Sequence, residues 1–269
     1  MRRRILQIAG VLGLLAVSVA AAILFACPYC RAFASRAVAT PLATFYIEHR
    51  WLRYAEGAFL VYYPAGGAIA DNPRAWLKPR LDAFQANCRY LGVDCNFGIT
   101  FYVFDSREQG ARYGLSLGFA APFLRRVYTS CNQTPGHELT HVIVGQAYQD
   151  RHIRSALVRE GLATLLNGED WLDFDRASFE SVRDTYLEAS DLLGMNFWWR
   201  DVDYYIAASF VRYLVDVYGL EKLKNLLGQG PMDEKTAFAA VYGKPFEGLF
   251  TEWKDRLKKK GVEAGFADQ

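Results

Sequence analysis

Two histidines four residues apart, followed at a distance by a glutamate, limit the folds open to this chain more than any other feature. Residues 137–141 read His-Glu-Leu-Thr-His, and eighteen residues separate His141 from Glu160. On an α-helix, a spacing of four residues places two side chains about 40° apart and one turn displaced, on the same face. Glu160 reaches the same point when a second helix returns antiparallel to the first. The pattern therefore predicts two packed helices with these three side chains between them.

The three side chains have the composition of a zinc site. A catalytic Zn²⁺ takes three protein ligands and keeps its fourth position for water. We therefore expect His137, His141 and Glu160 as ligands, with Glu138 beside the metal as a general base. In the alternative interpretation, the imidazoles pack against the core and Glu138 is a solvated charge. Glu160 favours the metal, because a carboxylate on an otherwise apolar helix is costly unless it is paired or metal-bound.

The hydrophobic periodicity divides the chain into two parts near residue 135. Before that point, β-rich runs predict strands at residues 59–63, 98–104 and 126–130, with a helix at about 72–90. After it, the pattern is helical almost throughout, with segments near residues 136–147, 154–166, 176–192, 203–217, 220–228 and 245–260. A small mixed sheet with helices, followed by a helical half, is an α+β fold.

The N-terminus predicts a membrane segment. Arginines at residues 2–4 precede an apolar run over residues 5–26, and about 20 apolar residues are enough to cross a bilayer core as a helix. A cleaved signal peptide has the same layout with a shorter apolar region, and Cys27 ends a lipobox-like sequence, so cleavage and lipidation stay open. In each case the arginines stay in the cytoplasm and the chain after Cys27 is exported.

The expected organisation is a transmembrane anchor over residues 1–27, a membrane-proximal connector over 28–53 and a single extracytoplasmic domain over 54–269. The formal net charge of +2 and the scattered basic residues give no nucleic-acid footprint. His49 lies in the connector and His152 in a polar loop, and both are expected to be solvated.

Five cysteines are too few for a disulfide-dense scaffold. An oxidising compartment would allow Cys88 and Cys95 to pair, which leaves Cys131 over. Cys27 and Cys30 have the spacing of a thioredoxin-type redox pair, but no predicted strand precedes them. For these two cysteines, the interpretation without a redox role is favoured.

A second sequence match lies at the expected glutamate ligand. Glu160-Gly161-Leu162-Ala163, together with residues 137–141, resembles the gluzincin branch of zinc metallopeptidases, especially the peptidase MA-like domains. The likeness extends from about Phe59 to the C-terminal helix. It implies a thermolysin-like zincin fold, one Zn²⁺ per chain on the three residues named above, and hydrolysis of peptide or protein substrates by zinc-bound water that Glu138 activates.

The helix expected after the site carries a further likeness. Residues 204–214, followed by Tyr218-Gly219, are similar to the helix after the zinc site in gluzincin aminopeptidases. There, a tyrosine ten residues before a leucine donates a hydrogen bond to the developing oxyanion. The resemblance implies this role for Tyr204, or for Tyr205 if the register differs by one. The alternative is that two aromatic residues open an amphipathic helix.

The chain also departs from the family pattern. Thr164 stands four residues beyond Glu160, where thermolysin-like members have an aspartate that orients a histidine. The G-x-M-E-N strand motif, which grips a free amine in aminopeptidases, is absent, so exopeptidase specificity is not supported. Two rival functions stay open: a metallopeptidase-like binding or scaffold module of the envelope, and a zinc hydrolase of a non-peptide amide or ester.

Overall fold

A computed structural model describes residues 40–113, 118–148, 155–167, 174–184, 187–194, 201–230 and 232–263 of the chain. The apolar run over residues 5–26, the cysteines at 27 and 30, and His152 lie outside these ranges. Within the ranges, no helix has both the length and the hydropathy that crossing a bilayer requires. The N-terminal anchor therefore stays a prediction.

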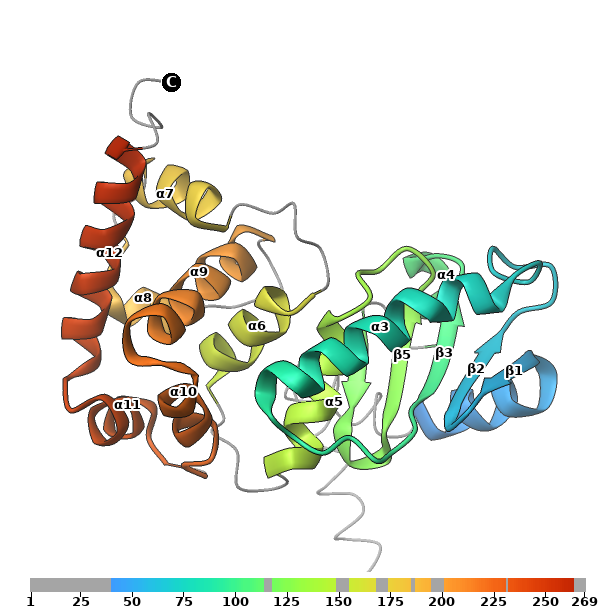
Figure 1. Cartoon of the computed structure of the whole chain (residues 1–269). Helices are drawn as coiled ribbons and strands as arrows, with labels where there is room; N and C mark the ends of the chain where they lie inside the picture. The colour runs from blue at the N-terminus through green and yellow to red at the C-terminus, as the bar shows by residue number, and fades with distance from the viewer. Residues whose placement is uncertain are drawn as a thin grey trace, which may run out of the picture.

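The first part of the domain is a mixed five-stranded sheet with the order β1-β2-β3-β5-β4 (Figure 1). β2 pairs with β3, and β3 with β5, in parallel, whereas β1 and β4 are antiparallel to their neighbours. The strands are β1 (Leu52–Glu56), β2 (Phe59–Tyr63), β3 (Thr100–Phe104), β4 (Phe119–Ala121) and β5 (Arg126–Ser130). The three strands that the sequence predicts are β2, β3 and β5.

Alternation of side chains along the strands gives the sheet two different faces. Val61, Phe101 and Val127 belong to the main core, which they share with residues of α3 (Pro73–Leu91) and α5 (His137–Tyr148). α3 begins after Asn72, whose Oδ1 accepts a hydrogen bond from the backbone N–H of Ala75 at 3.0 Å. The predicted helix over residues 72–90 is thus confirmed.

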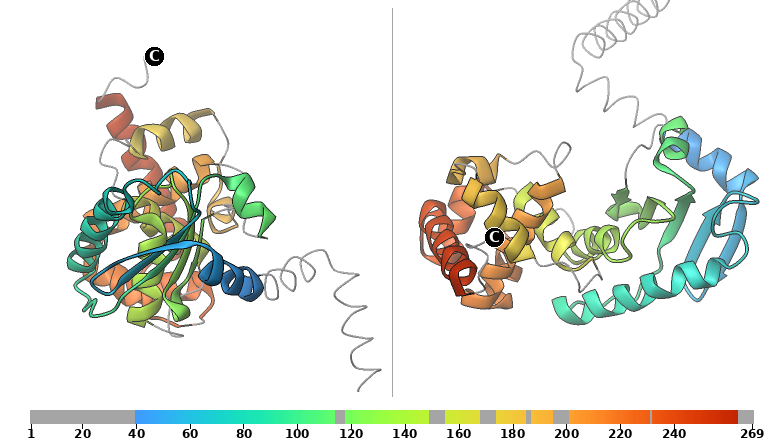
Figure 2. Two further views of the ribbon diagram at one scale, coloured as in Figure 1. Left: turned by 90° about the vertical axis from the view of Figure 1, so that its right-hand side faces the viewer. Right: turned by 90° about the horizontal axis from the view of Figure 1, so that it is seen from above.

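The opposite face of the sheet carries stacked tyrosines. The Tyr102 ring lies 5.4 Å from that of Tyr62 and 4.6 Å from that of Tyr128. Residues 40–50 form a helix that covers these rings, on the side of the sheet away from α3 (Figure 2, right). Thr44 Oγ1 hydrogen-bonds Tyr128 Oη at 2.8 Å. The expected connector over residues 28–53 thus contains a packed helix, and the expected boundary at residue 54 falls inside β1.

The second part of the domain is helical. Its helices are α6 (Ala156–Leu165), α7 (Phe174–Asp184), α8 (Ala189–Leu193), α9 (Asp201–Tyr218), α10 (Leu220–Leu227), α11 (Glu234–Tyr242) and α12 (Phe246–Glu263). α9 packs against α6, α7 and α10. Phe210 of α9 meets Phe246 and Trp253 of α12 with ring centroids 5.6 and 5.8 Å apart. The α+β class predicted from the sequence is confirmed.

Several elements of the structure differ from the sequence prediction or were not predicted. The sequence predicts a single helix over residues 176–192, whereas in the described residues α7 ends at Asp184 and α8 begins at Ala189. β1, β4, α11 and the six-residue α4 (Arg107–Arg112) were not predicted. β4 and α4, with three and six residues, are too short to establish a period of their own.

The cysteine pair that the sequence allows is present as a disulfide. Cys88, near the end of α3, forms a disulfide with Cys95, with their Cα atoms 6.2 Å apart. Among the described residues, Cys131 is the free cysteine, and its thiol donates to the carbonyl oxygen of Asp105 at 3.3 Å. The disulfide fixes the chain where it leaves α3 for β3.

Candidate metal centre

The three predicted ligands lie on two facing helices, at the junction of the sheet and the helical part (Figure 1). His137 is the first residue of α5, and His141 follows one turn later. Glu160 lies midway along α6. α6 starts at a defined residue because Ser155 Oγ accepts a hydrogen bond from the backbone N–H of Val158 at 3.3 Å.

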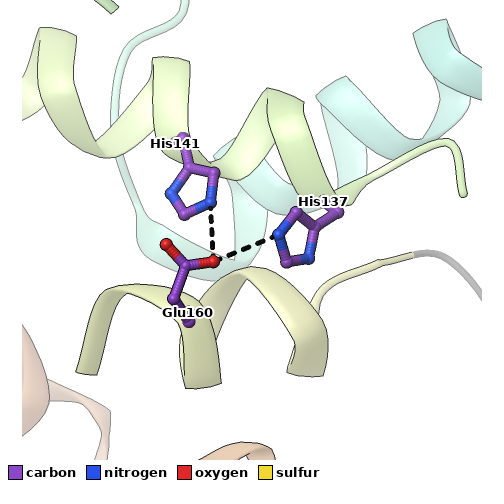
Figure 3. Close-up of side chains that lie close together, drawn as sticks. All are labelled: His137, His141 and Glu160. Carbon is purple, nitrogen blue, oxygen red and sulfur yellow. Dashed lines mark ion pairs between the residues drawn. The ribbon is translucent and has the colours of Figure 1, made fainter. Parts of the chain in front are cut away.

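Both imidazole rings face one carboxylate oxygen (Figure 3). Nε2 of His137 and Nε2 of His141 each lie 3.3 Å from Oε2 of Glu160. Three atoms that bind zinc at about 2 Å in a tetrahedral arrangement stand about 3.3 Å apart. The three ligand atoms lie within 4.8 Å of one another, so the group could hold a metal ion. The predicted proximity of these residues is confirmed.

The group is partly buried but open to solvent. The side chains of His137, His141 and Glu160 are 20%, 11% and 19% exposed. Burial acts to raise the pKa of Glu160, but His141 and His137 outweigh it and hold that pKa well below its usual range. The Glu160 carboxyl is therefore anionic at neutral pH.

Glu138 stands beside this group with a different protonation behaviour. Burial raises the pKa of the Glu138 carboxyl to about 7, with His137 opposing the rise and the Glu160 carboxylate adding to it. A carboxyl whose pKa lies near neutrality can accept and return a proton efficiently. The pKa of Glu160 is lowered, as expected of a metal ligand, and the pKa of Glu138 is raised, as expected of a general base.

Tyr204, and not Tyr205, lies at the site. The Tyr204 ring is 5.8 Å from the His137 ring, whereas the Tyr205 ring lies 6.1 Å from that of Phe174 on α7. α9 comes this close to α6 because position 161 is a glycine: a Cβ on Gly161 would stand 2.5 Å from the carbonyl oxygen of Ala207. The part that Tyr204 plays in chemistry stays a prediction.

A buried amide that the sequence analysis missed joins the two ligand helices to α3. Nδ2 of Asn87 donates to Thr140 Oγ1 on α5 and to the carbonyl oxygen of Leu166 at the end of α6, both at 3.0 Å. The backbone N–H of Gly136 donates to the carbonyl oxygen of Asn167 at 2.7 Å. The start of α5 and the end of α6 are thus tied together.

A signal for this tie exists in the sequence. Asn87 lies on the buried face of α3 among apolar residues, and Arg80, two turns earlier, is the other polar side chain of that kind. Buried polar groups are hydrogen-bonded, so both positions predict a partner, although the sequence does not identify it.

Two further predicted positions have other roles. Thr164, at the place of the family's orienting aspartate, is buried, and its hydroxyl oxygen has no hydrogen-bond partner among the residues that the structure describes. His49 is exposed on the helix over residues 40–50, where its Nδ1 lies 2.7 Å from the carbonyl oxygen of Phe45. His49 is thus solvated, as expected.

Comparison of the sequence with protein-family models and with curated proteins identified no relative. No family model matches the chain, and a search of curated proteins found no significant match. The functional assignment therefore depends on the geometry and chemistry of the site.

Proposed function

We propose that this chain is a zinc-dependent metallopeptidase with a thermolysin-like, gluzincin-type site. The proposal rests on the two 3.3 Å separations between Glu160 Oε2 and the imidazole nitrogens, which match the spacing of neighbouring ligands on a tetrahedral ion. The chemistry of the ligands also fits, since two imidazoles and one carboxylate form the protein part of known catalytic zinc sites.

The mechanism assigns one step to each neighbouring residue. Zinc held by His137, His141 and Glu160 would supply a Lewis acid that polarises a carbonyl and lowers the pKa of water. Glu138 takes the proton of the attacking water and later passes it to the leaving nitrogen. Tyr204 donates a hydrogen bond to the oxygen on which negative charge develops. An amide bond is hydrolysed without a covalent intermediate on the protein.

The strand next to the site supports a peptide substrate. β4 lies at the end of the described sheet, where it pairs with β5 on one side. Gly118 precedes this strand, and a Cβ placed on it would stand 2.5 Å from Glu138 Oε1. An extended peptide can add to an edge strand through main-chain hydrogen bonds, which would bring it past the proposed base.

We also propose that the domain acts outside the cytoplasm, tethered to a membrane by residues 1–27. The apolar run and the preceding arginines support the tether. The Cys88–Cys95 disulfide supports the location, because disulfides persist in oxidising compartments. The substrates would then be peptides or proteins of the cell envelope or the exterior.

Metal content and turnover of the purified full-length protein test the proposal. We expect about one zinc per chain, lost in His141→Ala, by elemental analysis. Glu138→Gln is expected to keep its zinc but to cleave a mixed peptide library at least about 100-fold more slowly, by mass spectrometry of the products. His49→Ala removes an exposed histidine away from the site and should change neither quantity.

Each departure from these results has a distinct meaning. Zinc that persists in His141→Ala contradicts the ligand assignment, and full turnover by Glu138→Gln contradicts the mechanism. A zinc-loaded wild-type protein that cleaves no peptide favours the binding-module alternative. Turnover confined to non-peptide amides or esters favours the other rival.

A further inference from the structure

A glutamine amide shares one small space with the proposed base. A Cβ built on Gly118 would stand 2.4 Å from Nε2 of Gln133 and 2.5 Å from Oε1 of Glu138. Both side chains therefore lie against the backbone of Gly118, at a position where a side chain on that residue would collide with them. Within the described residues, neither Gln133 Nε2 nor the Glu138 carboxylate has a hydrogen-bond partner.

The orientation of the Gln133 amide is set by its oxygen. Gln133 Oε1 accepts hydrogen bonds from Thr129 Oγ1 at 2.6 Å and from the backbone N–H of Ser130 at 3.2 Å. Because two donors hold the oxygen, the NH₂ group is left as the free end of the amide. A donor with a fixed direction thus stands beside an acceptor, the Glu138 carboxylate.

The backbone of Gln133 is also held from α3. Nη2 of the buried Arg80 donates to the carbonyl oxygen of Gln133 at 2.7 Å, and its Nη1 donates to that of Trp76 at 2.9 Å. The Arg80 guanidinium stacks over the Trp76 ring at 3.7 Å. Trp76 Nε1 in turn donates to the carbonyl oxygen of Cys131 at 2.9 Å. The turn that carries Gln133 is therefore preorganised.

We propose that Gln133 is a substrate-binding residue whose Nε2 donates a hydrogen bond to a backbone carbonyl oxygen of a peptide lying beside Glu138. The inference rests on the proposed peptidase function and deepens it. Every peptide unit offers the same carbonyl, so Gln133 would contribute affinity for any peptide chain and little preference among side chains. Gly118 is part of the same subsite because a larger residue there would displace the Gln133 amide and the Glu138 carboxylate.

Two hydroxamates separate this inference from the function on which it rests. Acetohydroxamate can bind a metal ion but carries no peptide, whereas a tripeptide hydroxamate adds backbone carbonyls. Binding of each to the full-length, zinc-loaded protein is measured by calorimetry, for the wild type, Gln133→Leu and Gly118→Ala. Gln229→Leu is the matched control, since Gln229 lies after α10 and donates to the carbonyl oxygen of Asn225.

We expect Gln133→Leu to raise the Kd of the tripeptide hydroxamate about three- to tenfold, the effect of one lost hydrogen bond. The Kd of acetohydroxamate and the zinc content should stay at their wild-type values. Gly118→Ala should give the same selective loss, which keeps the test decisive if Gln133→Leu does not fold. Gln229→Leu should bind both compounds as the wild type does.

Contrary results are distinguishable. If the variants at 133 and 118 bind the tripeptide hydroxamate as tightly as the wild type, the role of Gln133 is wrong while the peptidase proposal stands. If the wild type binds acetohydroxamate but gains no affinity from the peptide part, both are overturned. If the variants lose affinity for both compounds equally, Gln133 supports the metal ligands and binds no peptide.

Discussion

Asn87 supports the candidate metal centre although it carries none of the three potential ligand atoms. The side-chain amide of Asn87 donates a hydrogen bond to Thr140, which lies between the two histidines in the sequence. It donates another to the end of the helix that carries Glu160. The bond to Thr140 is buried and the bond to Leu166 is partly buried, and a buried polar group left without its hydrogen bond costs about 1–3 kcal/mol. The separation of the two ligand helices is therefore fixed by hydrogen bonds as well as by apolar packing.

At this scale, the residues found from the sequence were those whose spacing has a geometric meaning. His137, His141 and Glu160 follow from the helical repeat, and the structure brings them together. Asn87, Gly118 and Gln133 could not be found in this way. The partners of Asn87 lie 53 and 79 residues away, and its hydrogen bonds exist once α3, α5 and α6 are packed.

Glu252 on α12 gives a prediction for acid stability. Hydrogen bonds from Lys244, Tyr218 and Tyr213 lower the pKa of Glu252 to about 2. A carboxylate whose pKa is lower in the folded than in the unfolded state stabilises the fold at a pH above its unfolded-state pKa. This stabilisation is lost as the pH falls to the folded-state pKa. The pair with Lys244 is 40% exposed on the Glu252 side, so solvent screening keeps the effect small.

We expect Glu252→Gln to lower the Tm by about 2 °C at pH 7. The difference from the wild type should shrink below about pH 4.5 and vanish near pH 2. Thermal unfolding followed by circular dichroism at a series of pH values measures it. Glu263→Gln is the control, because Glu263 is 63% exposed and lies 3.9 Å from Lys259. A Tm difference that stays constant across this pH range would contradict the assignment.

At the scale of single elements, the disulfide at the end of α3 gives a stability prediction. Cys88 and Cys95 are seven positions apart in the sequence, and closing a loop of that length lowers the entropy of the unfolded chain by the equivalent of about 2 kcal/mol. The double variant Cys88→Ala, Cys95→Ala should lower the free energy of unfolding by about that amount, measured by urea titration. Cys131→Ser is the control, because it removes a cysteine that forms no disulfide. An unchanged urea midpoint in the double variant would refute the expectation.

The elements that the sequence predicts well are those with several turns or with alternating side chains. α3, α9 and α12 each have 18 or 19 residues, enough for the apolar stripe to stand out. β4 has three residues, so no alternation can identify it. It exists because β5 offers an edge for pairing, and a neighbouring strand is not a property of its own sequence.

At the scale of the whole molecule, the proposed ion would connect the two parts of the domain. Two ligands belong to α5, which packs on the sheet, and the third belongs to α6 in the helical part. An ion that binds the folded state alone, at 100 times its Kd, stabilises that state by about 2.7 kcal/mol. Zinc should therefore raise the Tm of the metal-free wild type by about 5–10 °C.

Differential scanning fluorimetry with and without zinc measures this rise. His141→Ala lacks one ligand and should show little shift at the same zinc concentration, whereas His49→Ala should respond as the wild type does. Equal shifts in the wild type and in His141→Ala would mean that zinc stabilises the protein from some other place.

The division into a sheet and a helical part was visible in the sequence because the hydrophobic period changes near residue 135. The arrangement of the two parts was not. The helix over residues 40–50 illustrates the reason, since it covers a face of the sheet built from residues up to 84 positions away. Which surface covers which depends on the complete set of packed elements.

The close approach of α9 to Gly161 restricts which residues position 161 can accept during evolution. Glu160 would be constrained by the proposed ion, but its neighbour Gly161 is constrained by the closely packed Ala207 carbonyl and Val211 side chain of α9. A descendant that acquires any side chain at position 161 must move α9, and Tyr204 moves with it. We therefore expect Gly161 to be among the most slowly changing positions, although it has no reactive side chain. Loss of this glycine in a lineage would indicate that the site is no longer under selection.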